Sequence, residues 1–310
     1  MTLMDNRAKK HHIVPQVLQK QFAIQGDQQR IWRTKREACS RSFQSLGRKR
    51  IAKTFVINDY YTVLENDQRS DLIEREFYAK IDDFLGRILP EIIQILNSGS
   101  IPEFSPESLD AIREVTMHMA KRTPDFEEHD DIALGRELVE TTLQDLSDQI
   151  PLARRKQLEA DLTDDVRLRD KGRDIRVTAR IENSQRVNEA LSQLVPRWAI
   201  SETKHSFILA SRMVYRIGNG GPNGLSNPKM EMWMPITPKI ALVLVRDPGN
   251  RIPHRVVDTP DHIRRINEYA VRNSFEVASH SEALLKSLVG KVPLSSNAPF
   301  APNRLLGQMQ

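Results

Sequence analysis

The sequence predicts an α+β protein that is predominantly helical, with a small N-terminal β element, long central helices and short antiparallel strands in the C-terminal third. Apolar residues recur every three to four positions through much of residues 66–195, which is the period of helices that face a core. From Trp198 onward, short apolar runs alternate with turn residues, as is typical of strands. The composition, 39% hydrophobic and 28% charged over 310 residues, is ordinary for a folded soluble protein.

The first expected segment, residues 1–65, contains the predicted N-terminal β element. Gly26-Asp27 is a turn candidate before Arg30–Thr34, where apolar and polar side chains are mixed, and this pattern predicts a small hairpin. Residues 54–64 are rich in β-branched and aromatic side chains around a turn candidate at Asn58-Asp59. They predict a second short strand pair.

The second segment, residues 66–195, is expected to be helical. A helix should begin near Ser70 and stop at Asn97-Ser98-Gly99. A second should begin at Ser105-Pro106-Glu107, because serine can cap the helix, proline suits its first turn and a carboxylate favours the positive end of its dipole. It should end near Thr123-Pro124, and two to four further helices should fill residues 125–194.

The third segment, residues 196–292, is expected to hold four or five strands and a closing helix after Asp258-Thr259-Pro260. Residues 293–310 are expected to be a disordered tail. The glycine-rich stretch 218–224 lacks a phosphate-loop or dinucleotide fingerprint, so a loop is expected there. The segments are expected to pack as one integrated domain.

Cysteine usage and hydropathy indicate the compartment. The single cysteine, Cys39, excludes an internal disulfide framework and multi-cysteine metal sites, which fits a reducing compartment. No run approaches the roughly 18 apolar residues of a membrane helix, and residues 1–10 lack the apolar core of a signal peptide. We expect a cytoplasmic protein with no membrane association.

Positive charge is concentrated at the N-terminus. Residues 1–53 carry thirteen basic and three acidic side chains, a net charge of +10, whereas the other 257 residues carry −5. A concentrated positive surface attracts polyanions, and DNA or RNA is the commonest such partner. The alternative is that this segment lies against acidic residues of its own chain or of a protein partner. The candidate nucleic-acid-binding residues are Arg7, Lys9, Lys10, Arg48, Lys49 and Arg50.

The order of several motifs resembles the bacterial family catalogued as domain of unknown function 4238. The motifs are His11-His12-Ile13-Val14-Pro15-Gln16 with Phe22-Ala23 downstream, Tyr60-Tyr61, Arg122-Thr123-Pro124, Trp233–Pro238 and Ile266-Asn267. The resemblance covers most of the chain and implies a functional role for a histidine of the pair and for Pro15. Family members commonly carry an aspartate where this chain has Arg212. If that aspartate is a metal ligand or a general base in the family, this chain has either lost the activity or uses another acid, such as Asp247, in its place.

The adjacent histidines are the best candidates for chemistry, because imidazole titrates near neutral pH and acts as acid, base or metal ligand. In an extended segment His11 and His12 point to opposite sides, so that only one faces a given site. The string His-His-x-x-Pro also resembles the opening of the His-Asn-His nuclease motif, in which a histidine activates water beside a metal ion. The closing histidine of that motif is missing, since no histidine lies between Ile13 and His118. The alternative is a buried, hydrogen-bonded structural histidine.

Arg122 is the third candidate catalytic residue. A guanidinium can bind two phosphate oxygens at once, but the position of Arg122 at the end of a helix favours the alternative, in which it complements the helix dipole. His118, four residues earlier, shares its helix face. The acidic run around His129 has no standard metal spacing, so we expect a solvated helix start there.

Three functions remain open from the sequence. The leading hypothesis is a nucleic-acid-acting protein, a metal-assisted phosphodiesterase or nuclease in a bacterial defence or toxin setting, which would use a divalent metal of unknown identity. The alternative is a non-enzymatic binding or assembly module, as a homo-oligomer or with a protein partner, in which the histidine motif is structural. A hydrolase of small phosphorylated substrates is the third. Whether the protein is an enzyme is left open.

Overall fold

Two compact units make up the chain, and each is assembled from three separated stretches of sequence. The computed structural model describes residues 9–37, 42–65, 68–126, 130–145, 149–222 and 224–290. Unit 1 comprises residues 1–11, 57–81 and 127–182, and unit 2 comprises residues 12–56, 82–126 and 183–310. The segment boundaries expected near residues 65 and 195 therefore lie inside these stretches, and the expected tail, 293–310, lies outside the described residues.

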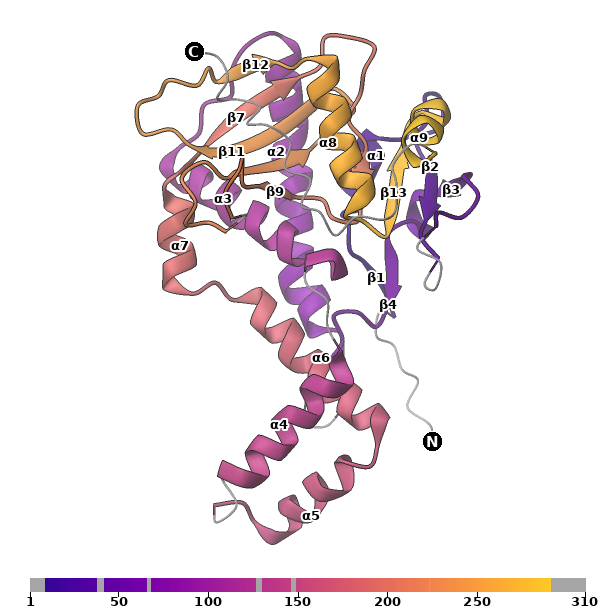
Figure 1. The fold of residues 1–310 in the computed structure, drawn as a ribbon, viewed down its shortest axis with the longest axis vertical. Coiled ribbons are helices and arrows are strands. Elements are labelled where there is room, and N and C mark those ends of the chain that lie inside the picture. Colours follow the sequence, from indigo (N-terminus) through magenta and orange to yellow (C-terminus); the bar gives the residue numbers. More distant parts are fainter. Residues whose placement is uncertain are drawn as a thin grey trace. The chain divides into compact units, whose positions relative to one another are not determined.

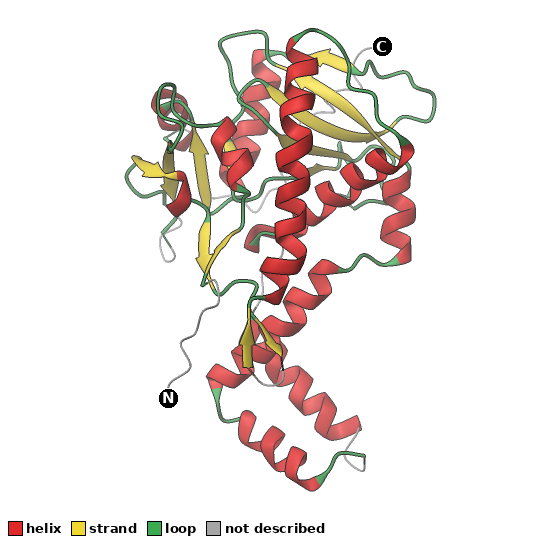
Figure 2. Ribbon diagram, turned by 180° about the vertical axis from the view of Figure 1, so that it is seen from behind, coloured by secondary structure: helices red, strands yellow, loops and turns green. Residues whose placement is uncertain are grey.

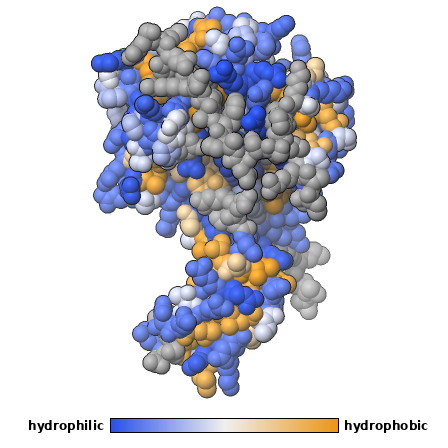
Figure 3. Space-filling view, viewed as in Figure 1, coloured by the Kyte–Doolittle hydropathy of each residue, from blue (hydrophilic) through white to orange (hydrophobic). Residues whose placement is uncertain are grey.

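Unit 1 is mainly helical. Its elements are the hairpin β5 (Val63–Glu65) and β6 (Gln68–Ser70), the π-helical turn η2 (Ile73–Tyr78), α4 (Asp131–Asp145), α5 (Leu152–Asp161) and α6 (Asp165–Ile181). The helices α4 and α6 touch at Gly135 and Gly172, where a methyl group on Gly172 would lie 1.8 Å from the Asp131 backbone oxygen. Apolar side chains also reach the surface of this unit (Figure 3), among them Leu152, which is 68% exposed.

A five-stranded sheet forms the larger part of unit 2. Its order is β12 (Arg255–Val257), β7 (Leu194–Ile200), β11 (Ile240–Arg246), β10 (Glu231–Pro235) and β9 (Tyr215–Ile217), antiparallel except for the β12–β7 pair. The helix α2 (Ala79–Asn97), which enters from unit 1, covers one face of this sheet, and α8 (Pro260–Arg272) lies on the other side (Figures 1 and 2). The α2 face is apolar and includes Trp198, Met234 and Leu242. The helices α3 (Pro106–Lys121) and α7 (Gln185–Ser192) and the turn η3 (Pro124–Phe126) complete this part.

A second sheet of unit 2 joins segments that are far apart in sequence. Its order is β3 (Gly47–Arg50), β2 (Arg30–Lys35), β13 (Glu276–Ser279) and β8 (Leu209–Ala210). The short helix α1 (Gln16–Gln21), the 3-10 turn η1 (Ile51–Lys53) and α9 (Glu282–Val289) complete this part. The strands β1 (Lys10–His12) and β4 (Val56–Asn58) pair where the chain passes from one unit to the other.

Local signals in the sequence predicted several helix ends correctly. α2 ends at Asn97, before Gly99 with φ +83°, and the Ser105 side chain caps α3 by accepting the Ser108 N–H at 3.2 Å. The strand pair expected within residues 54–64 is wrong, because β4 pairs with β1 and β5 pairs with β6. None of the described helices is both long enough and apolar enough to cross a membrane.

Candidate functional site

His11 is a buried side chain of unit 1 with structural contacts. Its Nδ1 accepts the backbone N–H of Tyr61 at 2.8 Å, and its ring stacks on the Tyr61 ring with centroids 5.4 Å apart and an angle of 7°. A ring nitrogen that accepts a hydrogen bond carries no proton, so this imidazole is neutral. His11 is 0% exposed, and it anchors the Tyr60-Tyr61 turn from within.

His12 points away from His11, as alternation along a strand requires, and it belongs to unit 2. Burial lowers the pKa of His12, and the nearby charge of Arg122 lowers it further. The Asp82 carboxylate and the backbone carbonyls of Ile51 and Ala52 act in the opposite direction but do not reverse the shift. Its buried Nε2 has no hydrogen-bond partner within the described chain. The lowered pKa therefore favours the neutral form of the His12 imidazole near neutral pH, and its Nε2 is enclosed without a hydrogen-bond partner among the described residues.

Arg122 lies beside His12 and is fully buried, with 0% exposure. Its guanidinium donates to Asp82 of α2 through two nitrogens, Nη1 to Oδ1 and Nη2 to Oδ2, the latter at 3.3 Å. A buried charge needs such a partner, because its desolvation is otherwise uncompensated. The two nitrogens that could have bound phosphate oxygens are thus occupied by a carboxylate, and Arg122 acts on His12 through its charge. We call His12, Asp82 and Arg122 the His12 cluster.

Asp82 was missed by the sequence-based reasoning. It is a charged residue in the first turn of α2 and looks like an ordinary solvent-facing position. Its side chain is 32% exposed, so it is the part of the Arg122 pair that solvent reaches. His118, which shares the Arg122 helix face, has its Nε2 3.5 Å from the Glu114 carboxylate.

Arg212 lies near a buried acid that the sequence-based reasoning also missed. Burial raises the pKa of Asp125 to about 6, although the Ser211 hydroxyl, the Arg212 charge and the Phe275 N–H each lower it. Asp125 accepts from the Ser211 hydroxyl and from Phe275 N at 3.2 Å. Its position directly after Arg122-Thr123-Pro124 was the available signal.

Asp247, the acid considered as a substitute for the position of Arg212, has its own hydrogen-bond partners. Its carboxylate accepts from the Arg197 guanidinium at 2.8 Å and from the backbone N–H groups of Arg251 and Ile252, both at 2.9 Å. These bonds lower the pKa of Asp247 although burial alone would raise it. Asp247 therefore holds the turn after β11 together.

The basic N-terminal residues divide into two kinds. Arg33 donates to the buried Glu276 at 2.7 Å, and Arg36 donates to the last carbonyls of α8, including that of Val271 at 2.6 Å. Arg33 is thus paired with an acid of its own chain, and Arg36 binds backbone carbonyls at the end of α8. Arg48, Lys49 and Arg50 instead lie exposed on β3, an edge strand. They are exposed positive charges of this sheet, as is Arg30 on β2.

The other predicted basic residues lie elsewhere. Lys9 and Lys10 are exposed residues of unit 1, and Arg7 lies outside the described residues. Residues 127–129 of the acidic run are likewise outside them. Within the described ranges, no three histidine, cysteine, aspartate or glutamate side chains are placed to hold one metal ion.

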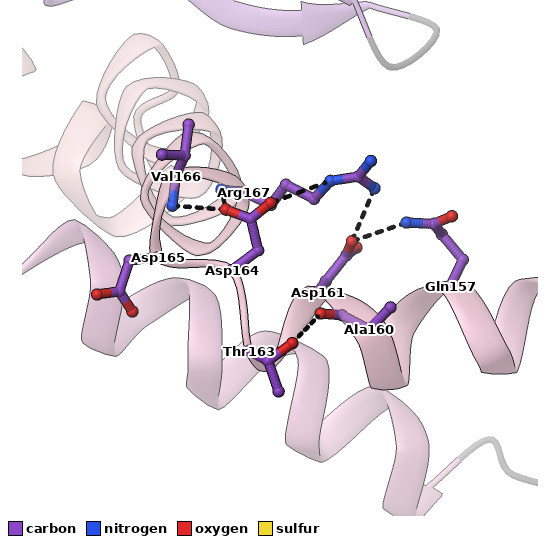
Figure 4. A pocket seen from close by; sticks show the side chains of 8 residues that line it. All are labelled: Gln157, Ala160, Asp161, Thr163, Asp164, Asp165, Val166 and Arg167. Atoms are coloured by element: carbon purple, nitrogen blue, oxygen red, sulfur yellow. Dashed lines mark hydrogen bonds and ion pairs between the residues drawn. The ribbon is translucent and has the colours of Figure 1, made fainter.

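A shallow hollow of unit 1 contains none of the predicted residues. It lies between the end of α5 and the start of α6 (Figure 4), where Asp161 accepts from Gln157 and Arg167, each at 2.9 Å. Burial alone would raise the pKa of Asp161, but these bonds and the Lys171 ammonium lower it. Its own neighbours satisfy this carboxylate, so the hollow is a structural ion-pair network.

Comparisons with known proteins give a family and no activity. No curated protein matches this chain, and no solved structure matches it. A family model described as "Protein of unknown function (DUF4238)" matches residues 10–283. This range runs from β1 to α9 and includes every member of the His12 cluster. The chain therefore belongs to the DUF4238 family.

Proposed function

We propose that the protein acts on nucleic acid, with β3 as the phosphate-binding strand and His12 as the residue that performs chemistry. The observation that carries the proposal is the turn η1, which directly follows Arg50. Its carbonyls at Ile51 and Ala52 face His12. An exposed basic strand and an imidazole whose buried Nε2 has no hydrogen-bond partner among the described residues are thus joined by one turn within unit 2.

The chemistry that fits His12 is general-base catalysis on a phosphodiester. A neutral imidazole can take a proton from water or, in RNA, from the ribose 2′-hydroxyl as that oxygen attacks phosphorus; the bond from phosphorus to the leaving sugar oxygen breaks, and that oxygen takes a proton from solvent. The lowered pKa of His12 keeps the ring unprotonated near pH 7. Cleavage should therefore decline as the pH falls below the usual histidine value of 6.5, because the base becomes protonated. We include in this function the form of the reaction that a divalent metal ion assists.

Two measurements test this function. Binding of labelled DNA and RNA oligonucleotides is measured at low salt and again with added salt, because release of counterions from phosphates makes such binding salt-sensitive. Cleavage of the same oligonucleotides is followed with Mg²⁺, with Mn²⁺ and with EDTA. Absence of salt-sensitive binding to every oligonucleotide would refute the proposal.

Variants locate the chemistry. His12→Ala should abolish cleavage and leave oligonucleotide binding within a few-fold of the unmodified protein. The matched control is His254→Ala, because His254 is an exposed histidine of the same unit. It should cleave normally. If both variants cleave at the unmodified rate, His12 is not the base.

A second function, a non-enzymatic binding or assembly module with a structural motif, is favoured by His11. A histidine that is stacked and hydrogen-bonded in the interior serves packing. His11→Ala should lower the free energy of unfolding by about 1–3 kcal/mol, because Tyr61 N–H loses a buried acceptor. If His12→Ala destabilises the protein by the same amount and no cleavage is found for the unmodified protein, the module is the better account.

A further inference from the structure

The exposed face of the β2–β3 pair combines arginines with an aromatic ring. In the antiparallel register Arg30 is opposite Arg50 and Trp32 is opposite Arg48. Opposite residues share a face of the sheet, and so do alternate residues along a strand. These four side chains therefore lie together, and we call them the Trp32 face. The other face carries Ile31, which is 0% exposed, and Arg33, which is bound to Glu276.

Trp32 is the tryptophan of this face and is partly exposed. The chain has three tryptophans, and the other two, Trp198 and Trp233, are 1% and 0% exposed. The Arg48 guanidinium lies over the Trp32 ring, 5.0 Å from its centroid. The indole and the guanidinium are both planar groups on which a nucleobase can stack.

The positive charge around Trp32 is largely uncompensated. Arg48 and Arg50 form no ion pair within the described chain. Arg30 is 3.7 Å from Asp27, but both side chains are well exposed, at 47% and 39%, so this pair contributes little. The Trp32 face therefore offers cations to phosphates beside a ring that can stack on a base.

We propose that the Trp32 face binds single-stranded nucleic acid, with an unpaired base on the Trp32–Arg48 pair and the flanking phosphates on Arg30 and Arg50. This inference rests on the proposed function and names its substrate class. In a duplex the bases are stacked on one another, so a duplex can use the arginines but not the indole. A single strand can use both, and it gains about 1–3 kcal/mol for each stacked base.

The first test uses the unmodified protein and the fluorescence of Trp32. Single-stranded oligonucleotides should quench the emission of the surface tryptophan, because Trp198 and Trp233 are enclosed. A duplex of equal length and inorganic polyphosphate, which has no bases, should bind without comparable quenching. Poly-glutamate tests an acidic protein partner. Equal quenching by poly-glutamate or by polyphosphate would overturn the assignment.

Variants then separate stacking from charge. Trp32→Ala should weaken single-strand binding by about 5- to 150-fold, the equivalent of one stacked base, and should leave duplex binding nearly unchanged. Trp32→Phe retains a ring and should restore most of the affinity, which also controls for folding. Arg50→Ala should weaken the binding of both single strands and duplexes. It should also reduce the slope of log K against log salt concentration by about 1.

The outcomes distinguish this inference from the proposed function. If single strands and duplexes bind equally, and Trp32→Phe and Trp32→Ala leave both unchanged, nucleic-acid binding stands and the single-strand assignment is overturned. If no oligonucleotide binds in a salt-sensitive manner, the proposed function fails and the inference fails with it.

Discussion

Asp82→Asn removes the charge that neutralises a fully buried guanidinium. Arg122 is 0% exposed and has the Asp82 carboxylate as its charged partner, whose side chain is 32% exposed. Breaking a buried ion pair by removing one partner costs about 3–5 kcal/mol. Solvent already screens the exposed side of Asp82, so we expect Asp82→Asn to lower the free energy of unfolding by about 2–3 kcal/mol. Against a total stability of about 5–15 kcal/mol, this is a large change.

Urea unfolding at pH 7, followed by circular dichroism, measures that loss. The control is Asp83→Asn, which removes an exposed carboxylate from the next position of α2 and should change stability by less than about 0.5 kcal/mol. The double variant Asp82→Asn/Arg122→Met should be more stable than Asp82→Asn alone, because it removes the buried charge as well.

The same substitution also shifts the titration of His12. Asp82 raises the pKa of His12 and Arg122 lowers it, so Asp82→Asn should lower that pKa further below its usual value. An NMR titration of the His12 ring measures the shift. A loss of stability below about 1 kcal/mol, or a rise of the His12 pKa, would refute the account of the His12 cluster.

Two other substitutions test buried features of the fold. Because burial raises the pKa of Asp125 to about 6, its contribution to stability is complete below pH 3.8 and is lost as the pH rises toward 6. The free energy of unfolding should therefore decline by about 3 kcal/mol across this pH range, and Asp125→Asn should remove that decline. A decline that is unchanged in the variant would contradict its assignment to Asp125. Gly172→Ala should cost at least about 2 kcal/mol, because its Cβ would lie 1.8 Å from the Asp131 backbone oxygen. Gly86→Ala in α2, where a Cβ meets nothing within 4 Å, should instead stabilise the protein by up to about 1 kcal/mol, and equal thermal shifts for the two variants would refute the close approach of α4 and α6.

Local chemistry explains what the sequence predicted well. The start of α3 follows from Ser105 and Pro106, and the end of α2 follows from Gly99, because caps and positive φ angles depend on neighbours within a few residues. The helical period of residues 79–97 is also a local property, since it needs only one apolar side to face any core.

Long-range pairing explains what the sequence did not predict. β2 lies between β3 and β13. The residues of β13 are more than 240 positions further along the chain than those of β2, so no local turn signal could reveal this pairing. Phe55 takes a positive φ of 54°, and its N–H donates to the distant Glu276 at 2.8 Å. Such a conformation is stabilised only by a partner that the fold supplies.

The candidate site shows the same division. From the sequence, His11 and His12 lie on opposite sides only if their segment is extended, because strand geometry alternates side chains, and β1 supplies that condition. The sequence by itself placed the excess positive charge in residues 1–53. Only the tertiary structure decided that His11 stacks on Tyr61, that His12 lies beside Arg122 and Asp82, and which basic side chains are buried in ion pairs. Burial and the charges that surround a side chain are set by residues distant in sequence, and they decide whether an imidazole or a guanidinium is free to act.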